Sequence, residues 1–272
     1  MMYDFAYHRA RTLDDARAAF RDADDAAYVS GGHSLLPTMK NRLAAPDRLV
    51  HLTAIPELRG IARDGDRLVI GAAETHAGVA ASPVVQEAIP ALAALAGSIG
   101  DPQVRHRGTM GGSVANNDPA ADYPSAVLGL GATIHTSERE IDADDFFAGM
   151  FTTALDEGEI VTRIAFPVPD SAGYAKMRNP ASRYALAASF VARFGGDVRV
   201  AITGAGSDGV FRWHEAEEAL AARFEPGALD GLAVDPDGMM SDMHASAAFR
   251  AHLCAVGTAR AVANPGRLTL LA

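Results

Sequence analysis

The stretch from residue 99 to residue 124, IGDPQVRHRGTMGGSVANNDPAADYP, most constrains what this chain can fold into, because it is too polar for a core element and too patterned for a linker. Within it a Gly–Gly pair at 111–112 stands between Thr109 and Ser113. Glycine can adopt positive φ and lets the backbone approach a ligand closely, and consecutive exposed N–H groups beside hydroxyl side chains cradle an anion such as a diphosphate. Asp122 could then accept hydrogen bonds from a sugar hydroxyl. One such pair is equally compatible with an ordinary turn, so the interpretation depends on a second loop of the same kind.

That second loop is SGGHS at residues 30–34. It lies between a strand predicted at 27–29 and a helix predicted to start at Leu35, and this is the context in which backbone N–H groups receive a phosphate. It is neither a GxGxxG dinucleotide fingerprint nor a GKS or GKT phosphate loop. His33 invites a catalytic role, but no carboxylate or nucleophile stands at a recognisable spacing from it. The sequence therefore favours a loop histidine that hydrogen-bonds the backbone or a ligand.

Charge and cysteine content exclude several classes of function. A net charge of −10 and a pI of about 5.3 argue against nucleic acid and against an anionic membrane surface. No apolar run is long enough for a signal peptide or a membrane span, so we expect a cytoplasmic protein without membrane insertion. The single cysteine, Cys254, excludes an internal disulfide and a cysteine-ligated iron–sulfur cluster held by this chain alone, and its apolar surroundings predict a buried thiol. No paired histidine motif occurs, so no metal is predicted.

Prolines and strand patterns divide the chain into three predicted units with boundaries near residues 55 and 170. A capping-box pattern at Thr12 and Asp15 predicts the first helix, and the Gly–Gly pair at 195–196 predicts a hairpin in the last unit. Three strands followed by helices make that unit α+β. Helices are expected over residues 13–22, from 35, and over 88–98, 126–130, 215–223 and 246–263; strands are expected over 27–29, 48–52, 67–71, 133–136, 159–166, 174–177, 186–194 and 198–203.

Five motifs together closely resemble the FAD-binding medium subunit of molybdenum hydroxylases, nearest to the carbon monoxide dehydrogenase type. They are YVSGGHSLLPTMKNRL at 28–43, the stretch 99–124, NPASRYA at 179–185, VAITGAGSDGVFR at 200–212 and DMHASAAFRAHL at 242–253. The resemblance covers essentially the whole chain in the same order, and several long motifs in register are far more specific than any one of them.

The resemblance implies an α+β fold. It consists of a two-subdomain FAD-binding domain of the vanillyl-alcohol-oxidase (PCMH) type, followed by a C-terminal antiparallel sheet with helices. The expected division is an N-terminal α/β subdomain at 1–55, a second α+β subdomain at 56–170, and a three-stranded antiparallel sheet with helices at 171–272.

The resemblance also implies residue roles toward FAD. Two loops, 30–36 and 109–113, should clasp the diphosphate, Asp122 should hold the ribitol or ribose, and two isoleucines should supply apolar contacts. Lys176 and Tyr184 should lie near the isoalloxazine ring, where a lysine would favour the anionic reduced ring; from the sequence alone, a solvated strand-edge lysine and a core tyrosine are the alternatives. No catalytic residue beyond FAD and no metal ligand is expected. The cofactor-binding set is Ser30, Gly31, Gly32, His33, Ser34, Leu35, Leu36, Ile99, Thr109, Gly111, Gly112, Ser113, Asn116, Asp118, Asp122, Ile160, Lys176 and Tyr184.

Two features near this set stay open. Arg105 and Arg107 could steer an anion or could bond local carbonyls. The pair Asn116–Asn117 departs from the small or histidine-containing pairs expected in relatives, although it removes no phosphate-cradling group.

The implied function is electron transfer within a three-component molybdenum hydroxylase. Substrate would be oxidised at a molybdopterin cofactor in a large subunit, and electrons would pass through two [2Fe–2S] clusters of a small subunit to FAD here. An external acceptor such as a quinone would then take them, and the assembly would be a dimer of heterotrimers. The alternatives are a xanthine, aldehyde or N-heterocycle dehydrogenase subunit, a stand-alone flavin reductase, and a non-catalytic FAD-binding or assembly protein.

Overall fold

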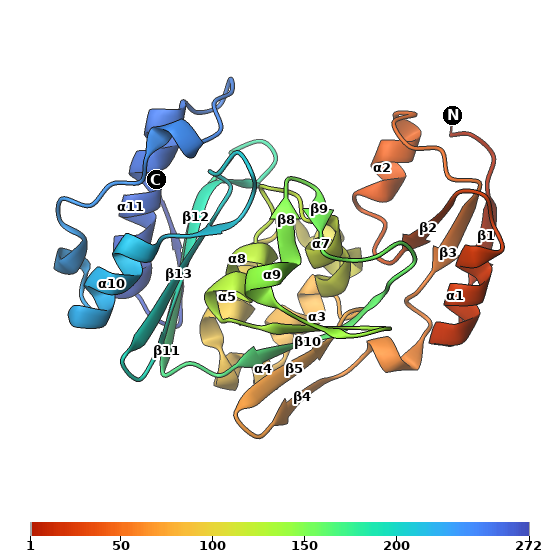
Figure 1. Cartoon of the computed structure of the whole chain (residues 1–272), viewed down its shortest axis with the longest axis horizontal. Coiled ribbons are helices and arrows are strands. Elements are labelled where there is room, and N and C mark those ends of the chain that lie inside the picture. The colour runs from red at the N-terminus through yellow and green to blue at the C-terminus, as the bar shows by residue number, and fades with distance from the viewer. Residues whose placement is uncertain (1, 272) are drawn as a thin grey trace.

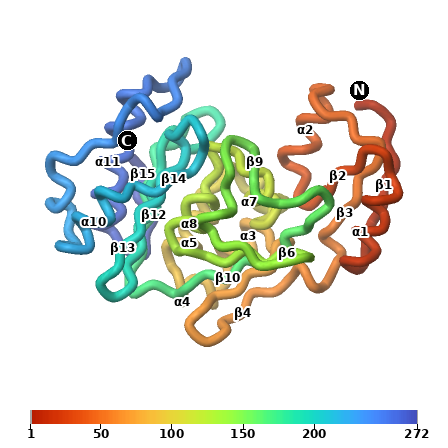
Figure 2. Tube along the Cα trace, in the orientation of Figure 1, coloured from red at the N-terminus to blue at the C-terminus, as the bar shows by residue number. Residues whose placement is uncertain are grey.

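Three sheets follow one another along the chain in a computed structural model that describes residues 2–271 (Figure 1). The Cα trace runs from the N-terminal sheet at one end of the molecule, through the central unit, to the C-terminal sheet at the other end (Figure 2). Across the described residues, no helix combines the length and the apolar character that a membrane span requires.

The first sheet is parallel and small, with strand order β1-β3-β2. Helix α1 (Leu13–Arg21) connects β1 to β2 and begins where the sequence predicts, because the Thr12 hydroxyl accepts a hydrogen bond from the Asp15 N–H at 3.1 Å. The glycine loop then leads from β2 into α2 (Leu35–Lys40). The strands are β1 (Ala6–Arg9), β2 (Ala26–Val29) and β3 (Arg48–His51).

The second sheet is antiparallel, with strand order β4-β5-β10-β6-β7. Its central strand, β10, is the apolar run predicted over residues 159–166. Helix α7 packs on β10, and helix α4 packs on β4. A separate two-stranded hairpin, β8 (Phe147–Gly149) with β9 (Thr152–Thr153), stands beside it. The strands are β4 (Ile61–Asp64), β5 (Arg67–Gly71), β6 (Thr133–Thr136), β7 (Glu140–Asp142) and β10 (Val161–Pro167). The helices are α3 (His76–Ala81), α4 (Pro83–Ala88), α5 (Pro90–Ser98), α6 (Pro102–Arg107), α7 (Met110–Asn116), α8 (Tyr123–Gly129) and α9 (Ala143–Phe146).

Two predictions for this unit were wrong. The single helix expected over 88–98 is interrupted at Ile89, whose backbone is not helical (φ −141°, ψ 76°). Proline disfavours the α conformation of the residue before it and starts helices well, so Pro90 separates α4 from α5. The loop expected at 109–113 is helical from Met110 onward: Thr109 caps α7 and Asp101 caps α6, each side chain accepting a hydrogen bond from the N–H of the third residue after it.

The third sheet has strand order β14-β13-β12-β11-β15. Helices α11 (Ala247–Ala263) and α10 (His214–Ala222) pack on β11–β13, which also contact α8 and α5 of the central unit. The predicted hairpin at 195–196 is confirmed. The three predicted antiparallel strands are present. The sheet is larger than predicted, because a two-residue strand and a parallel C-terminal strand extend it, and strands this short carry little sequence signal. The strands are β11 (Ser171–Arg178), β12 (Ala185–Phe194), β13 (Asp197–Thr203), β14 (Phe211–Arg212) and β15 (Leu268–Leu270).

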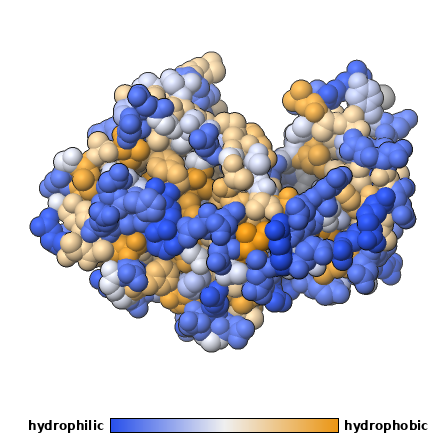
Figure 3. Space-filling view, viewed as in Figure 1, coloured by the Kyte–Doolittle hydropathy of each residue, from blue (hydrophilic) through white to orange (hydrophobic). Residues whose placement is uncertain are grey.

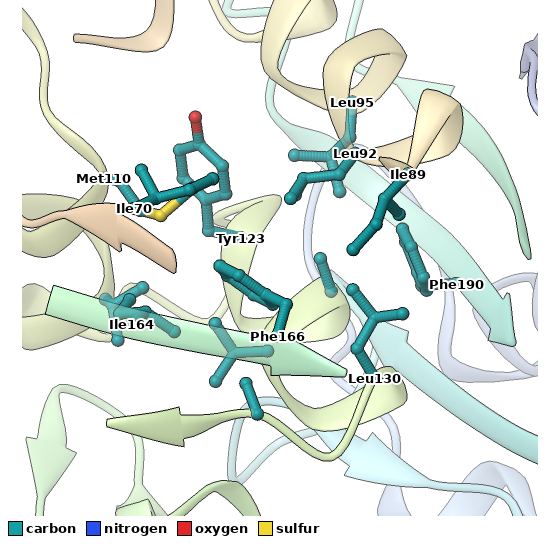
Figure 4. Packing of buried hydrophobic residues seen from close by; sticks show 14 of the residues in the cluster. Ile70, Ile89, Leu92, Leu95, Met110, Tyr123, Leu130, Ile164, Phe166 and Phe190 are labelled. Carbon is teal, nitrogen blue, oxygen red and sulfur yellow. The ribbon is translucent and has the colours of Figure 1, made fainter. Parts of the chain in front are cut away.

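One hydrophobic core joins the central unit to the C-terminal sheet. Figure 4 shows Ile70 and Ile164 of the second sheet, Tyr123 of α8 and Phe190 of β12 in the same packed cluster. A smaller core joins Val50 of the first sheet to residues on both sides of position 55. The sheets follow the predicted division at residues 55 and 170, but the cores cross it, so the domain boundaries stay a prediction.

Candidate functional site

A cavity of about 560 Å³ lies where the three units meet. Segments 27–35, 99–122, 159–161 and 182–184 line it, so each unit contributes a wall. The space-filling view shows the outline of the molecule hollowed between the N-terminal unit and the remainder (Figure 3). The volume falls within the roughly 300–1,000 Å³ of small-molecule and cofactor sites.

The structure brings the sequence-predicted site residues together. All of them line this cavity except Leu36 and Lys176. Leu36 packs against Gly32 of the loop at 30–34; a Cβ on this glycine would lie 2.9 Å from the Leu36 Cδ1. Lys176 is buried behind the cavity and reaches it through another side chain, described below.

The loop at 30–34 has the backbone of an anion site. Gly32 has φ +73°, a conformation that favours glycine. Gly31 lies so close to the backbone at residues 107–108 that a Cβ on this glycine would be 2.4 Å from the Arg107 carbonyl oxygen. Within residues 2–271 the N–H groups of residues 31–34 donate no hydrogen bond. Successive free N–H groups in a turn form a concavity that binds anions.

The glycine-containing segment at 109–113 differs from its prediction. Gly111 and Gly112 belong to the first turn of α7 and do not have positive φ. Their N–H groups are used inside the chain: the first donates to the Ala72 carbonyl at 2.9 Å and the second to the Thr109 hydroxyl at 3.3 Å. The Thr109 hydroxyl also donates to Ser30 Oγ at 2.9 Å, which ties the two stretches together. Free N–H donors are therefore found only in the loop at 30–34 of these two segments, whereas the segment at 109–113 supplies close-packed backbone and hydroxyl groups.

Asp122 lies at the N-terminus of α8, and its carboxylate is buried at 4 % exposure. Tyr174 donates a short hydrogen bond to it, and Lys176 Nζ lies 2.7 Å from Oδ1 and 2.9 Å from Oδ2. Lys176 is therefore neither solvated nor part of the cavity wall. Its charge is paired with Asp122, a buried carboxylate of the cavity wall, whereas Glu159, also buried in the wall, is paired with Arg139.

The third wall is the loop between β11 and β12. Tyr184 is 46 % exposed, which contradicts a core tyrosine, and lies at the cavity. Arg183 adopts φ +65° and donates from Nη1 to the Gly100 carbonyl at 3.3 Å, bringing the C-terminal unit across to the helix-rich wall. Burial raises the pKa of the neighbouring Asp118 carboxyl. Burial and the charge of this aspartate in turn raise the pKa of the Tyr184 phenol, so the phenol remains a hydrogen-bond donor.

Sequence reasoning missed several residues of this site, among them His76 and Tyr174. His76 of α3 lines the cavity at 4 % exposure, and burial lowers its pKa from 6.5 to about 4, so its ring is neutral. No spacing in the sequence identified it. Tyr174 stands two residues before Lys176 on one strand, and this spacing places both on the same face of the sheet. That signal was available. Arg105 takes the local option, because its guanidinium donates to the carbonyls of residues 99 and 100.

The residues present fit a dinucleotide with a flat ring. Free N–H groups suit a diphosphate, and Ile99 and Ile160 offer apolar contact beside polar wall groups such as Asp122. A cavity built by two units and closed by a third unit with its own sheet defines the chain as a dinucleotide-cofactor-binding subunit.

Comparison with known proteins agrees. Residues 3–169 match the family described as FAD binding domain in molybdopterin dehydrogenase, and the chain belongs to this family. The carbon monoxide dehydrogenase medium chain of Hydrogenophaga pseudoflava is 35% identical over 242 residues, covering 84% of each chain. The nicotine 6-hydroxylase medium subunit of Paenarthrobacter nicotinovorans is 31% identical, covering 97% of this chain and 98% of that one.

A solved structure, reconstituted CO dehydrogenase from Oligotropha carboxidovorans, superposes with a TM-score of 0.88 at 33% identity, covering 97% of this chain and 98% of that chain. The predicted α+β fold and family are confirmed. The chain is an oxidoreductase flavoprotein subunit of the molybdenum hydroxylase family, and its cofactor is FAD.

Proposed function

We propose that this chain is the medium subunit of a carbon monoxide dehydrogenase-like complex and carries electrons through FAD. Electrons enter from [2Fe–2S] clusters of a small subunit, after substrate oxidation at a molybdopterin cofactor in a large subunit, and leave to an external acceptor such as a quinone. The three-walled cavity with free N–H groups at residues 31–34 carries the proposal. The lone and fully buried Cys254 supports the division of labour, because cysteine-ligated clusters then lie in another chain.

The chain's own residues bind and orient the cofactor. The N–H groups of residues 31–34 bind the diphosphate oxygens, with the Thr109 and Ser113 hydroxyls beside them. Asp122 accepts a hydrogen bond from a sugar or ribityl hydroxyl, Ile99 and Ile160 contact the ring, and Tyr184 lies beside the ring. When bound, the flavin supplies the two-electron chemistry that these side chains lack.

The visible absorption spectrum tests cofactor binding. We expect the full chain, incubated with FAD and desalted, to keep a flavin spectrum and to release FAD on denaturation. Gly31→Ala should lose flavin, because the added Cβ forces the loop away from the Arg107 carbonyl. Gly238→Ala, whose Cβ would meet no atom within 4 Å, is the matched control. A Gly31→Ala chain as yellow as the control would overturn the assignment of this loop.

Electron transfer and assembly need the partners. We expect the chain to co-purify with a small CxxxxCxxC-bearing subunit and a large molybdopterin subunit encoded beside it, at a mass of two copies of each. Bound flavin that a reduced small subunit does not reduce would favour a non-catalytic binding or assembly role. The family also includes nicotine- and glyceraldehyde-oxidising complexes, so substrate turnover by the assembled complex decides among carbon monoxide, aldehydes, xanthines and N-heterocycles.

A further inference from the structure

The cavity wall formed by residues 118–122 is fastened to the C-terminal sheet. The Gly204 N–H donates to the Pro119 carbonyl at 2.9 Å, and the Thr203 hydroxyl donates to the Ala121 carbonyl at 2.7 Å. The two donors are the last residue of β13 (Asp197–Thr203) and the residue after it, and neither lines the cavity. The position of this wall therefore depends on a unit that lies behind it.

The same wall is held by its side chain. Tyr174 and Lys176 of β11, at 0% and 1 % exposure, both direct polar atoms at the Asp122 carboxylate. Within residues 2–271 neither polar group has another hydrogen-bond partner. Two donors on two oxygens fix the rotation of a carboxylate, which has about four lone-pair sites and keeps acceptor capacity for a ligand.

The cluster of Asp122, Tyr174 and Lys176 also compensates the negative charge of the Asp122 carboxylate in the cavity wall. A buried carboxylate without a partner is costly, and beside an anionic diphosphate it would repel the ligand. The Lys176 ammonium neutralises it without entering the cavity. Burial and the Asp122 charge raise the pKa of Tyr174 well above its ordinary value, so the phenol stays a donor.

We propose that Tyr174 is a positioning residue for the cofactor. Together with Lys176 it fixes Asp122 in the orientation that accepts a cofactor hydroxyl, so the C-terminal unit contributes to FAD affinity without contacting FAD through these residues. The inference rests on the proposed function, because it takes FAD as the occupant of the cavity.

The test is FAD titration of the cofactor-stripped full chain, followed by flavin fluorescence and by visible circular dichroism of the bound flavin. Tyr174→Phe keeps the ring in the core and removes one hydrogen bond to a charged group. We expect FAD to bind about tenfold more weakly, with an altered dichroism spectrum. Ser189→Ala is the matched control. It removes a buried hydroxyl of the same sheet that contacts Cys254 and Thr258 of α11, so its affinity and spectrum should not change.

Charge variants complete the test. Lys176→Met should weaken FAD binding more than Tyr174→Phe, and Lys176→Arg should recover part of that loss. If Tyr174→Phe does not fold, Asp122→Asn replaces it, and native-like affinity in that variant overturns the inference. Equal affinity and identical dichroism in Tyr174→Phe and Ser189→Ala also overturn it and leave the proposed function standing. If the unsubstituted chain takes up no FAD, alone or co-expressed with its partners, the proposed function fails and this inference fails with it.

Discussion

Gly111 in the first turn of α7 lies directly against Ala72, the residue after β5. Its N–H donates to the Ala72 carbonyl oxygen at 2.9 Å, and a Cβ at Gly111 would stand 2.4 Å from the Ala72 Cβ. The contact holds the N-terminus of α7 against the C-terminal end of β5, an interior strand of the second sheet. The glycine is thus required by packing, whereas the sequence suggested backbone freedom.

This contact predicts the effect of Gly111→Ala. Overpacking of a close contact costs about 1–3 kcal/mol, so urea unfolding should show a loss of this size together with weaker FAD retention. Gly196→Ala is the control, because its Cβ would meet nothing within 4 Å and its φ is not positive; it should lie within about 0.5 kcal/mol of the parent. Equal midpoints for the two variants would contradict the tight contact.

Asn117 predicts a second stability effect. It ends α7 in the left-handed conformation (φ 43°), is 1 % exposed, and its amide donates to the carbonyls of Gly149 and Thr152 at 2.8 Å each. It therefore holds the β8–β9 hairpin. Asn117→Ala should cost about 2–4 kcal/mol, because it loses two buried hydrogen bonds and keeps a side chain in a strained conformation.

Asn117→Gly separates these two causes. It relieves the backbone strain but restores neither hydrogen bond, so its loss in urea unfolding should be smaller than that of the alanine variant. Equal stability of both variants would mean that the left-handed backbone costs nothing here.

Local features of this fold were predictable from the sequence. Thr12 capping, the hairpin at 195–196 and the strand–turn–helix around residues 30–34 are encoded by neighbouring residues, and the strands and helices that were predicted lie within a few residues of their observed ranges. The interruption of the helix at Ile89 was also predictable from neighbouring residues, because Pro90 disfavours a helical backbone at the residue before it. The alanine-rich helical pattern outweighed the proline in that prediction.

Contacts between distant segments were not predictable in this way. The Asp122–Tyr174 hydrogen bond joins residues 52 positions apart, and the close approach of Gly31 to Arg107 depends on how two units dock. A sequence pattern reports the period and polarity of an element but not which element packs against it. The resemblance to a family predicted the residues of the cofactor site. Only the structure shows that Lys176 lies behind Asp122 and not in the cavity wall.

Cys254 should be inert in the native state. It is fully buried on α11, and burial raises the pKa of its thiol to about 12. Only the thiolate reacts with disulfide reagents, so at pH 8 its modification should follow the opening of the structure. The rate should therefore rise steeply as urea approaches the unfolding midpoint. Rapid stoichiometric modification without denaturant would contradict the burial.

His76 predicts how stability depends on pH. Burial lowers its pKa from 6.5 to about 4 in the folded chain, and its Nδ1 has no hydrogen-bond partner among residues 2–271. Between pH 6.5 and pH 4 the unfolded state binds a proton that the folded state refuses, so stability falls as pH falls through this window. The full shift corresponds to about 3 kcal/mol.

His76→Gln removes this term, so the stability difference between variant and parent should change by about 3 kcal/mol in favour of the variant between pH 7.5 and pH 4. Urea unfolding across this range measures the difference with all other titrations shared. Val79→Ala, a fully buried change on the same helix without a titratable group, should show a difference that is constant with pH. A His76→Gln difference equally constant would mean that the imidazole protonates alike in both states, and that its place against Gly108 and Tyr123 does not exclude the charge.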